Sequence, residues 1–108
     1  MGRARVPWRY GANHEIDGVG DSGRARRIAG MVVVGGKLHR EYRFADFIHA
    51  FGFMATAAIG VEAMGHHPEW SNVWNRVTVD LTTHDAGGVT VKDVALAEKL
   101  EAIARKLQ

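Results

Sequence analysis

The spacing of apolar and polar residues changes near the end of the first quarter of the chain. In the Gly- and Arg-rich residues 1–28, neither the two-residue period of a strand nor the 3.6-residue period of a helix persists. A β-branched run, the pair Gly35-Gly36 and a second, alternating run follow, and together they predict a β-hairpin. We therefore expect an irregular N-terminal segment over residues 1–28 and one folded domain over residues 29–108.

A long apolar segment comes after the predicted hairpin, and its apolar residues recur at steps of four and three. This spacing places one apolar stripe along a helix, and the stripe would cover a sheet. Gly65 suits the left-handed position just past a helix, and Pro68 disfavours helical backbone at the residue before it, so the helix should end there. The stripe consists of Phe47, Phe51, Met54, Ala58 and Val61.

Residues 70–84 alternate between apolar and polar side chains, which predicts a long strand. After a turn at residues 85–88, Thr90 and Asp93 have the spacing of a capping box, and an apolar stripe follows to the end of the chain. The order of hairpin, helix, strand or strands, and helix predicts an α+β domain whose helices cover one face of an antiparallel sheet. The last stripe consists of Leu96, Leu100, Ile103 and Leu107.

Composition and charge exclude some partners and compartments. The sequence contains no cysteine, which removes disulfides and thiolate chemistry and favours the cytoplasm. The N-terminal residues lack an apolar signal region, and the apolar run at residues 54–61 is too short to cross a bilayer, so we expect no membrane association. The net charge of +2 reflects six arginines within residues 1–27. Few aromatic residues accompany them, so we expect a solvated segment and no nucleic-acid partner.

Three histidines lie at the ends of predicted elements, where functional sites are commonly built. His66 and His67 follow the long helix, and His84 ends the long strand. The C-terminal end of a helix favours a positive charge, as would Glu62 one turn earlier, so a protonated His66 could act as a general acid. A polar turn in which both adjacent imidazoles only cap helix carbonyls fits the same spacing.

Other interpretations are open for the histidine cluster, for Asp93 and for Trp70. The three histidines and Glu62 could bind zinc, but adjacent histidines point apart and no His-x-x-x-His pair is present, so we expect no metal. Asp93 stabilises a helix start whether or not a ligand is near. Trp70 suits a core or interface position, and it could equally form the wall of a site for a flat ligand.

The same residues resemble the signature of the pterin-4a-carbinolamine dehydratases. The signature reads Glu62-x-x-x-His66-His67-Pro68-Glu69-Trp70, then Asn72-Val73, Thr83-His84-Asp85, Gly88 and Asp93. The resemblance covers about residues 29–108 and includes the stretch HREYRFADFIHAFGFM. It implies an α+β fold with a four-stranded antiparallel sheet and helices packed on one face, assembled as a homodimer or homotetramer. It also implies no metal and no cofactor, because the pterin is the substrate.

The resemblance further implies a hydro-lyase that converts 4a-hydroxytetrahydropterin to quinonoid dihydropterin and water, recycling the tetrahydrobiopterin-type cofactor of aromatic amino acid hydroxylases. Losing water needs an acid for the hydroxyl and a base for the N5 proton, and imidazoles suit both tasks. By matching position, the catalytic set is His66, His67 and His84, with His67 orienting the pterin. The residues implied in substrate binding are Glu62, Gly65, Pro68, Trp70, Thr83, Asp85 and Asp93.

A second reading of the same fold is a non-catalytic pterin-binding or dimerisation module with a regulatory role. Some members of the family that the sequence resembles act as dimerisation cofactors for a homeodomain transcription factor. The chain departs from that family at its front, where relatives carry a leucine-containing helix and then a tryptophan. Here the segment is rich in Gly and Arg, and Met31 stands where the tryptophan would be.

Overall fold

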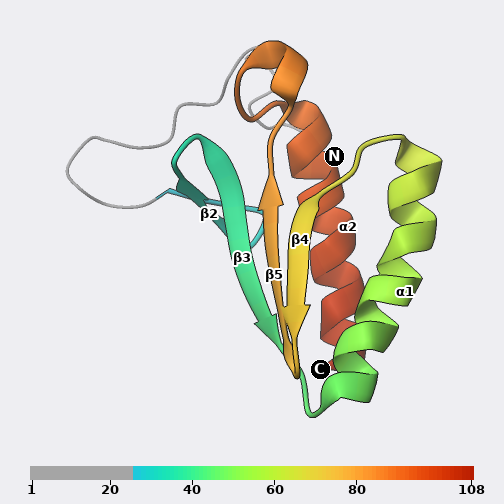
Figure 1. Ribbon diagram of the computed structural model, residues 1–108. Helices are drawn as coiled ribbons and strands as arrows, with labels where there is room; N and C mark the ends of the chain where they lie inside the picture. Colours follow the sequence, from blue (N-terminus) through green and yellow to red (C-terminus); the bar gives the residue numbers. More distant parts are fainter. Residues whose placement is uncertain (1–25) are drawn as a thin grey trace.

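The computed structural model describes residues 26–108 as a single antiparallel sheet covered on one face by two helices (Figure 1). The strand order across the sheet is β1-β2-β3-β5-β4. Helices α1 and α2 lie side by side on this face, as the sequence predicts for an α+β domain. The elements in chain order are β1 (Arg27–Ile28), β2 (Met31–Val34), β3 (Lys37–Arg43), α1 (Phe47–Met64), β4 (Glu69–Val73), β5 (Arg76–Leu81), the 3₁₀ helix η3 (His84–Ala86) and α2 (Val91–Leu107).

The sheet has five strands, so the expectation of four is wrong. The additional strand, β1, has two residues and pairs with β2 through a tight turn at Ala29 and Gly30, both of which have positive φ. A strand of two residues is too short to show an alternating pattern, which is why sequence reasoning placed it in the irregular segment. The remaining prediction for that segment, over residues 1–25, lies outside the described residues.

The predicted hairpin is confirmed as β2 and β3, joined at Gly35 and Gly36, which both have positive φ. The predicted long strand is instead two strands, because the chain turns at Trp74 and Asn75 and β4 then pairs with β5. Trp74 has a φ of 51°, a left-handed conformation unusual for a tryptophan. Sequence alternation continues through the turn, so it did not reveal the break.

Helix α1 is confirmed, but the stripe predicted to face the sheet is largely exposed. Phe47 and Phe51 are 49% and 56% exposed. The helix is apolar around most of its circumference, so spacings of four and three can be drawn on more than one face. The face in contact with the sheet carries small residues that allow close approach. Its buried residues are Ala50, Phe53, Ala57 and Val61.

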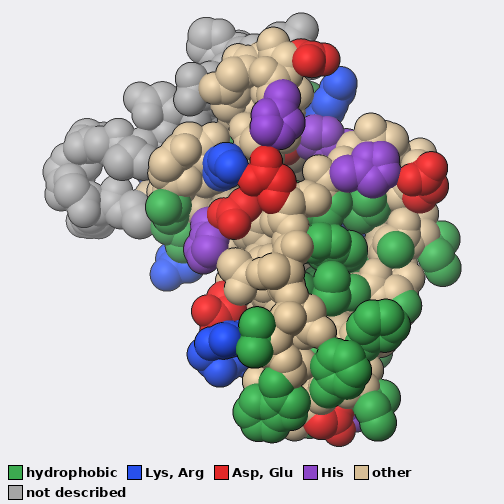
Figure 2. Space-filling view, viewed as in Figure 1, with side chains coloured by type: hydrophobic (Ala, Val, Ile, Leu, Met, Phe, Trp, Pro, Cys, Tyr) green, Lys and Arg blue, Asp and Glu red, His purple; other side chains and the backbone are tan. Residues whose placement is uncertain are grey.

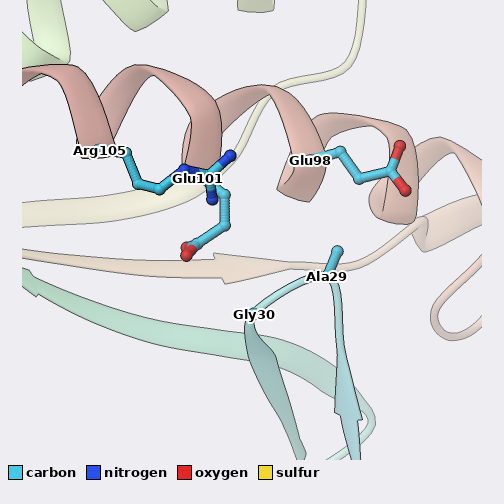
Figure 3. A pocket seen from close by; sticks show the side chains of 5 residues that line it. All are labelled: Ala29, Gly30, Glu98, Glu101 and Arg105. Carbon is cyan, nitrogen blue, oxygen red and sulfur yellow. The ribbon is translucent and has the colours of Figure 1, made fainter.

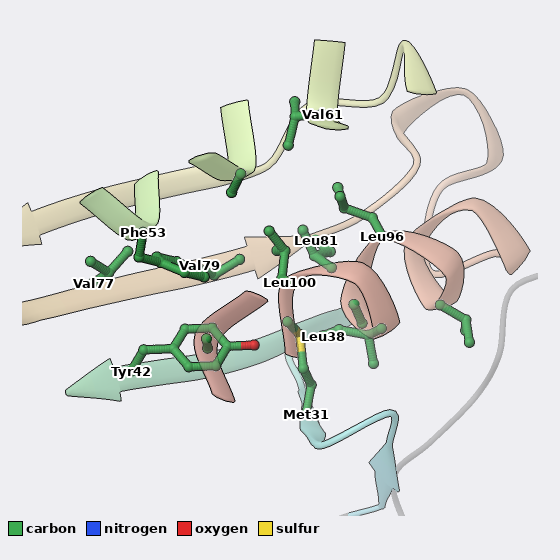
Figure 4. Close-up of a cluster of buried hydrophobic side chains, with 14 of the residues drawn as sticks. Met31, Leu38, Tyr42, Phe53, Val61, Val77, Val79, Leu81, Leu96 and Leu100 are labelled. Carbon is green, nitrogen blue, oxygen red and sulfur yellow. The ribbon is translucent and has the colours of Figure 1, made fainter. Parts of the chain in front are cut away.

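The hydrophobic core lies between the sheet and the two helices (Figure 4). Leu96 and Leu100 of α2 are fully buried, and Ile103 and Leu107 pack at the margin, so the predicted stripe of this helix is confirmed. The sheet contributes alternate residues of its central strands. The largest buried sheet side chains are Met31, Leu38, Tyr42, Val77, Val79 and Leu81.

Helix α1 is also long and apolar enough to cross a membrane by length and composition, with a mean hydropathy of 1.5. The expectation based on residues 54–61 considered only the most apolar part of this helix. One face of α1 packs into the core, and 22% of the apolar window is buried in the single chain.

Candidate active site

One end of the molecule brings together the C-terminus of α1, the segment after β5 and the N-terminus of α2 (Figure 1). A cavity of about 310 Å³ lies between these segments, and Figure 2 shows histidine side chains gathered at this end. The volume is at the small end of the range for ligand sites, so the cavity suits a compact ligand. Its lining residues are Gly65, His66, His67, Thr82, Thr83, His84, Asp85 and Lys92.

The end of α1 sets the position of the histidine pair. Gly65 has φ 66° and ψ 26°, as predicted for a left-handed residue after a helix, and its N–H donates to the carbonyls of Val61 and Glu62. The chain then leaves the helix through His66, His67 and Pro68 and enters β4. The turn therefore places both imidazoles beside the cavity rather than along the helix.

The ring of His66 pairs with a buried carboxylate. Its Nε2 lies 2.6 Å from Oδ1 of Asp93, whose side chain is completely buried. The other oxygen, Oδ2, accepts hydrogen bonds from the Thr83 hydroxyl at 2.7 Å and the Thr90 N–H at 2.9 Å. When the carboxylate is ionised it only accepts, so Nε2 of His66 then donates to Asp93, and Nδ1 is the ring nitrogen that this pair does not use.

The sequence suggested two roles for Asp93, stabilising the start of the last helix and belonging to the candidate site. Asp93 makes contacts of both kinds. It completes the capping box of α2 with Thr90, and it also holds His66. Glu62 was expected to favour the protonated form of His66, whereas the carboxylate that contacts His66 is Asp93. Glu62 lies one turn before the end of α1 and pairs instead with His67, with Oε1 2.9 Å from Nε2. Both side chains of this pair are mostly exposed.

His84 also lines the cavity, from the start of η3. Its Nε2 is 3.2 Å from Oε2 of Glu69, the first residue of β4. The other oxygen of Glu69 accepts a hydrogen bond from Nζ of Lys37 at 2.6 Å. This bond holds the pKa of Glu69 below its ordinary value and raises that of Lys37.

Only some of the other predicted site residues line the cavity. Thr83 is buried and forms an isolated bridge to Gly88, and Asp85 lines the cavity from η3. Trp70 packs at the margin of the core, and neither it nor Pro68 lines the cavity. Lys92 lines the cavity although sequence reasoning did not select it, since a lysine in the first turn of a helix carries no signal of its own.

Each of the three histidines therefore has its own carboxylate partner, which suits proton transfer by imidazole. Among residues 26–108, no three His, Asp or Glu side chains gather closely enough to hold a metal ion. The partners of His66 and His84 come from elements distant in sequence, so spacing along the chain could not have revealed them.

A second cavity, of about 300 Å³, lies between the turn after β1 and α2 (Figure 3). It is lined by Ala29, Gly30, Glu98, Glu101 and Arg105. Close to it, the Tyr42 hydroxyl donates to Glu101 at 2.7 Å. Burial, and then this hydrogen bond, raise the pKa of Tyr42 well above its ordinary value, so this tyrosine is a poor proton donor at neutral pH. The histidine-lined cavity is therefore the better candidate for acid/base chemistry.

Comparison with known proteins gives one family. The model of the family described as pterin 4 alpha carbinolamine dehydratase matches residues 30–103. A protein of Solibacter usitatus named for that enzyme is 68% identical over 79 residues, covering 73% of this chain and 83% of the relative. A protein of Prochlorococcus marinus with the same name is 46% identical over 79 residues, covering 73% of this chain and 82% of the relative.

A solved structure is also similar. The crystal structure of a transcriptional coactivator/pterin dehydratase from Brucella melitensis matches with a TM-score of 0.63 and 45% sequence identity. The match covers 74% of this chain and 81% of that chain. The family model, which matches residues 30–103, spans all the residues that line the histidine cavity.

Proposed function

Because the chain belongs to the pterin 4 alpha carbinolamine dehydratase family, we propose that it dehydrates a 4a-hydroxytetrahydropterin to the quinonoid dihydropterin and water. The observation that carries this proposal is the cavity with His66 and His84 in its lining, each paired with a carboxylate. The reaction would recycle the pterin cofactor of an aromatic amino acid hydroxylase. The chain is then a hydro-lyase, and the pterin is its substrate rather than a bound cofactor.

The chemistry requires one proton donor and one proton acceptor. The acid protonates the hydroxyl on C4a as the C4a–O bond breaks, and the base takes the proton from N5. The electron pair of the N5–H bond forms the new C4a=N5 double bond, and water leaves. In this mechanism His66 and His84 fill the two roles, and solvent returns each imidazole to its starting protonation state.

The remaining cavity residues would hold the pterin. His67, supported by Glu62, orients the ring system, while Asp85 and the backbone of Thr83 bind its polar edge. The carboxylate of Asp93 acts through His66. Gly65, Pro68 and Trp70 shape the turn and the strand that place these groups.

A direct assay tests this proposal. Adding the protein to freshly generated 4a-hydroxytetrahydropterin should accelerate formation of the quinonoid product, followed by absorbance. The rate should not change with a metal chelator, because no step of the mechanism uses a metal. A rate equal to that of the buffer control would reject the proposal, and loss of activity with chelator would reject the metal-free mechanism.

We also propose that the protein assembles as a homodimer or homotetramer in the cytoplasm. The outer face of α1 exposes several large apolar side chains, and more lie at the turn between β4 and β5 (Figure 2). A monomer seldom exposes an apolar patch of this extent to water, and a second copy could cover it. The exposed residues are Phe47, Ile48, Phe51, Ile59, Val73 and Trp74.

A second candidate function is a regulatory module, either pterin-binding or dimerising, without catalysis. The observation that favours it is the similar structure from Brucella melitensis, which is named as a coactivator as well as a dehydratase. Affinity capture from the native host, combined with the dehydratase assay, separates the two candidates. A stoichiometric protein partner together with no dehydratase rate would favour the module.

A further inference from the structure

We propose that Glu69 is a positioning residue for His84 and that Lys37 holds Glu69 in place. The inference rests on the proposed function for its kinetic consequences, but the geometry that carries it is independent of the substrate. Glu69 contacts both partners with different oxygens: Oε1 is 2.6 Å from Lys37 Nζ, and Oε2 is 3.2 Å from His84 Nε2.

The three residues come from different parts of the chain and meet on the sheet face opposite the helices. Lys37 begins β3 and Glu69 begins β4, with β5 between these two strands. His84 follows β5, so it lies above the end of the strand that separates the other two. In Figure 2 this end of the sheet shows basic, acidic and histidine side chains together. The sheet therefore places Lys37 and Glu69 near the same end, and the segment after β5 brings His84, whose side chain is 79% exposed, to Glu69.

The charge of Glu69 determines which nitrogen of His84 remains available. The hydrogen bond from Lys37 is the largest cause of the lowered pKa of Glu69, so the group stays ionised at neutral pH. An ionised carboxylate accepts only, so Nε2 of His84, which lies 3.2 Å from Oε2, is the ring nitrogen placed to donate to it, and Nδ1 is not engaged by Glu69. The same assignment holds for His66 with Asp93. Both candidate catalytic rings thus turn Nε2 toward a carboxylate, which leaves Nδ1 outside these two pairs.

The two supporting carboxylates differ in a way that makes Glu69 testable. Asp93 is completely buried and also caps α2, so replacing it changes the fold and the site together. Glu69 is 43% exposed, and the ion-pair partners of its carboxylate are Lys37 and His84. Exposed ion pairs contribute little to stability, so variants at Glu69 and Lys37 should fold as the parent does.

Kinetics of Glu69→Ala, Glu69→Gln and Lys37→Met test the first part of the inference. Glu69→Ala should lower kcat about fivefold with little change in KM, because ring orientation matters most in the transition state. Glu69→Gln keeps an acceptor oxygen, so its kcat should fall less than that of Glu69→Ala. The kcat of Lys37→Met should lie between those of Glu69→Gln and the parent. The matched control is Glu41→Gln, which removes an exposed carboxylate paired with Arg43 on another part of the same sheet. An unchanged kcat in Glu69→Ala would overturn the inference.

A double-mutant cycle shows whether Glu69 acts through His84. In the His84→Ala background, adding Glu69→Ala should cause no further loss of rate. A further fivefold loss there would assign Glu69 a role separate from His84 and reject the inference.

A spectroscopic measurement separates this inference from the proposed reaction. In the parent protein, NMR couplings between the α- and β-protons of His84 should show one side-chain rotamer, and in Glu69→Ala they should average. Couplings that stay unchanged would overturn the positioning role even if the protein is an active dehydratase. Averaged couplings would support it even if no dehydratase rate is found.

Discussion

The buried carboxylate of Asp93 links single-residue chemistry to the stability of a helix. One of its oxygens holds His66, and the other accepts from Thr83 and from the first N–H of the capping box at Thr90. A group that is buried, fully hydrogen-bonded and in contact with a cavity histidine can fix the orientation of that ring without rearranging during the reaction. Exposed Glu62 offers His67 a much weaker constraint.

Replacing the cavity histidines tests the residue-scale mechanism. His66→Ala and His84→Ala should each lower kcat about 100-fold or more, the usual loss when a general acid or base is removed. The measurement is the steady-state dehydratase rate, together with circular dichroism to confirm folding. His49→Ala is the matched control, because this exposed histidine pairs with Asp46 at the far end of α1. Full activity in both cavity variants would contradict their assigned roles.

Asp93→Asn separates the two contacts of the carboxylate. The amide can still accept from the helix N–H, but it cannot accept from all its present partners, so the hold on His66 weakens. We expect kcat to fall about 10-fold or more and the free energy of unfolding to fall by about 1–3 kcal/mol. Asp46→Ala removes the N-cap of α1 and should lower stability by about 1 kcal/mol while leaving kcat unchanged. Equal effects of both variants on kcat would show that lost stability, rather than lost positioning, explains the result.

At the scale of elements, the turn after α1 connects the helix to the site. Gly65 lies in the left-handed region, and an added Cβ would meet no atom within 4 Å, so the constraint there is conformational rather than steric. The ends of the two helices were well located from the sequence, because Gly65, Pro68 and the capping box mark them directly. Both ends of the predicted final helix and its capping box are likewise present.

The faces of elements were harder to predict than their ends. Helix α1 carries apolar residues on its inner and outer sides, so only packing decides that Phe53 is buried while Phe51 is not. The alternation of β4 continues through the turn at Trp74, so the sequence reads as one strand where the structure has two. The pairing of Glu69 with His84, and of Asp93 with His66, depends on sheet register and on the docking of α2. These pairings depend on tertiary structure, and the spacing of apolar residues along the sequence does not predict them.

A pair of glycine substitutions tests the element-scale argument. Gly65→Ala should lower the free energy of unfolding by about 1 kcal/mol, because alanine is disfavoured in the left-handed conformation. Gly52→Ala lies in the interior of the same helix with open space around it and should raise stability by about 0.5–1 kcal/mol. Urea unfolding followed by circular dichroism measures both. Destabilisation by Gly52→Ala, or none by Gly65→Ala, would contradict this account of α1 and its end.

At the scale of the whole molecule, helix α1 has two apolar surfaces with different surroundings. The inner surface of α1 forms the core with the sheet, and the outer surface is left uncovered in a single chain. The candidate site lies at one end of the fold, near the last turn of α1, whereas Phe47 and Phe51 lie in its first turns. Assembly through this outer surface would therefore leave the histidine cavity open to its ligand.

Phe51→Glu tests this arrangement. Placing a charge on the exposed apolar face should convert the proposed oligomer to monomers, because a buried unpaired carboxylate opposes association strongly. Size-exclusion chromatography with light scattering measures the mass, and the dehydratase assay on the same sample should show activity within about twofold of the parent, since Phe51 lies outside the cavity lining. Val34→Glu is the matched control, as it places a charge on an exposed apolar residue of β2, remote from α1. If the parent is already a monomer, or if Phe51→Glu remains oligomeric, the outer face of α1 is not the surface that joins the copies.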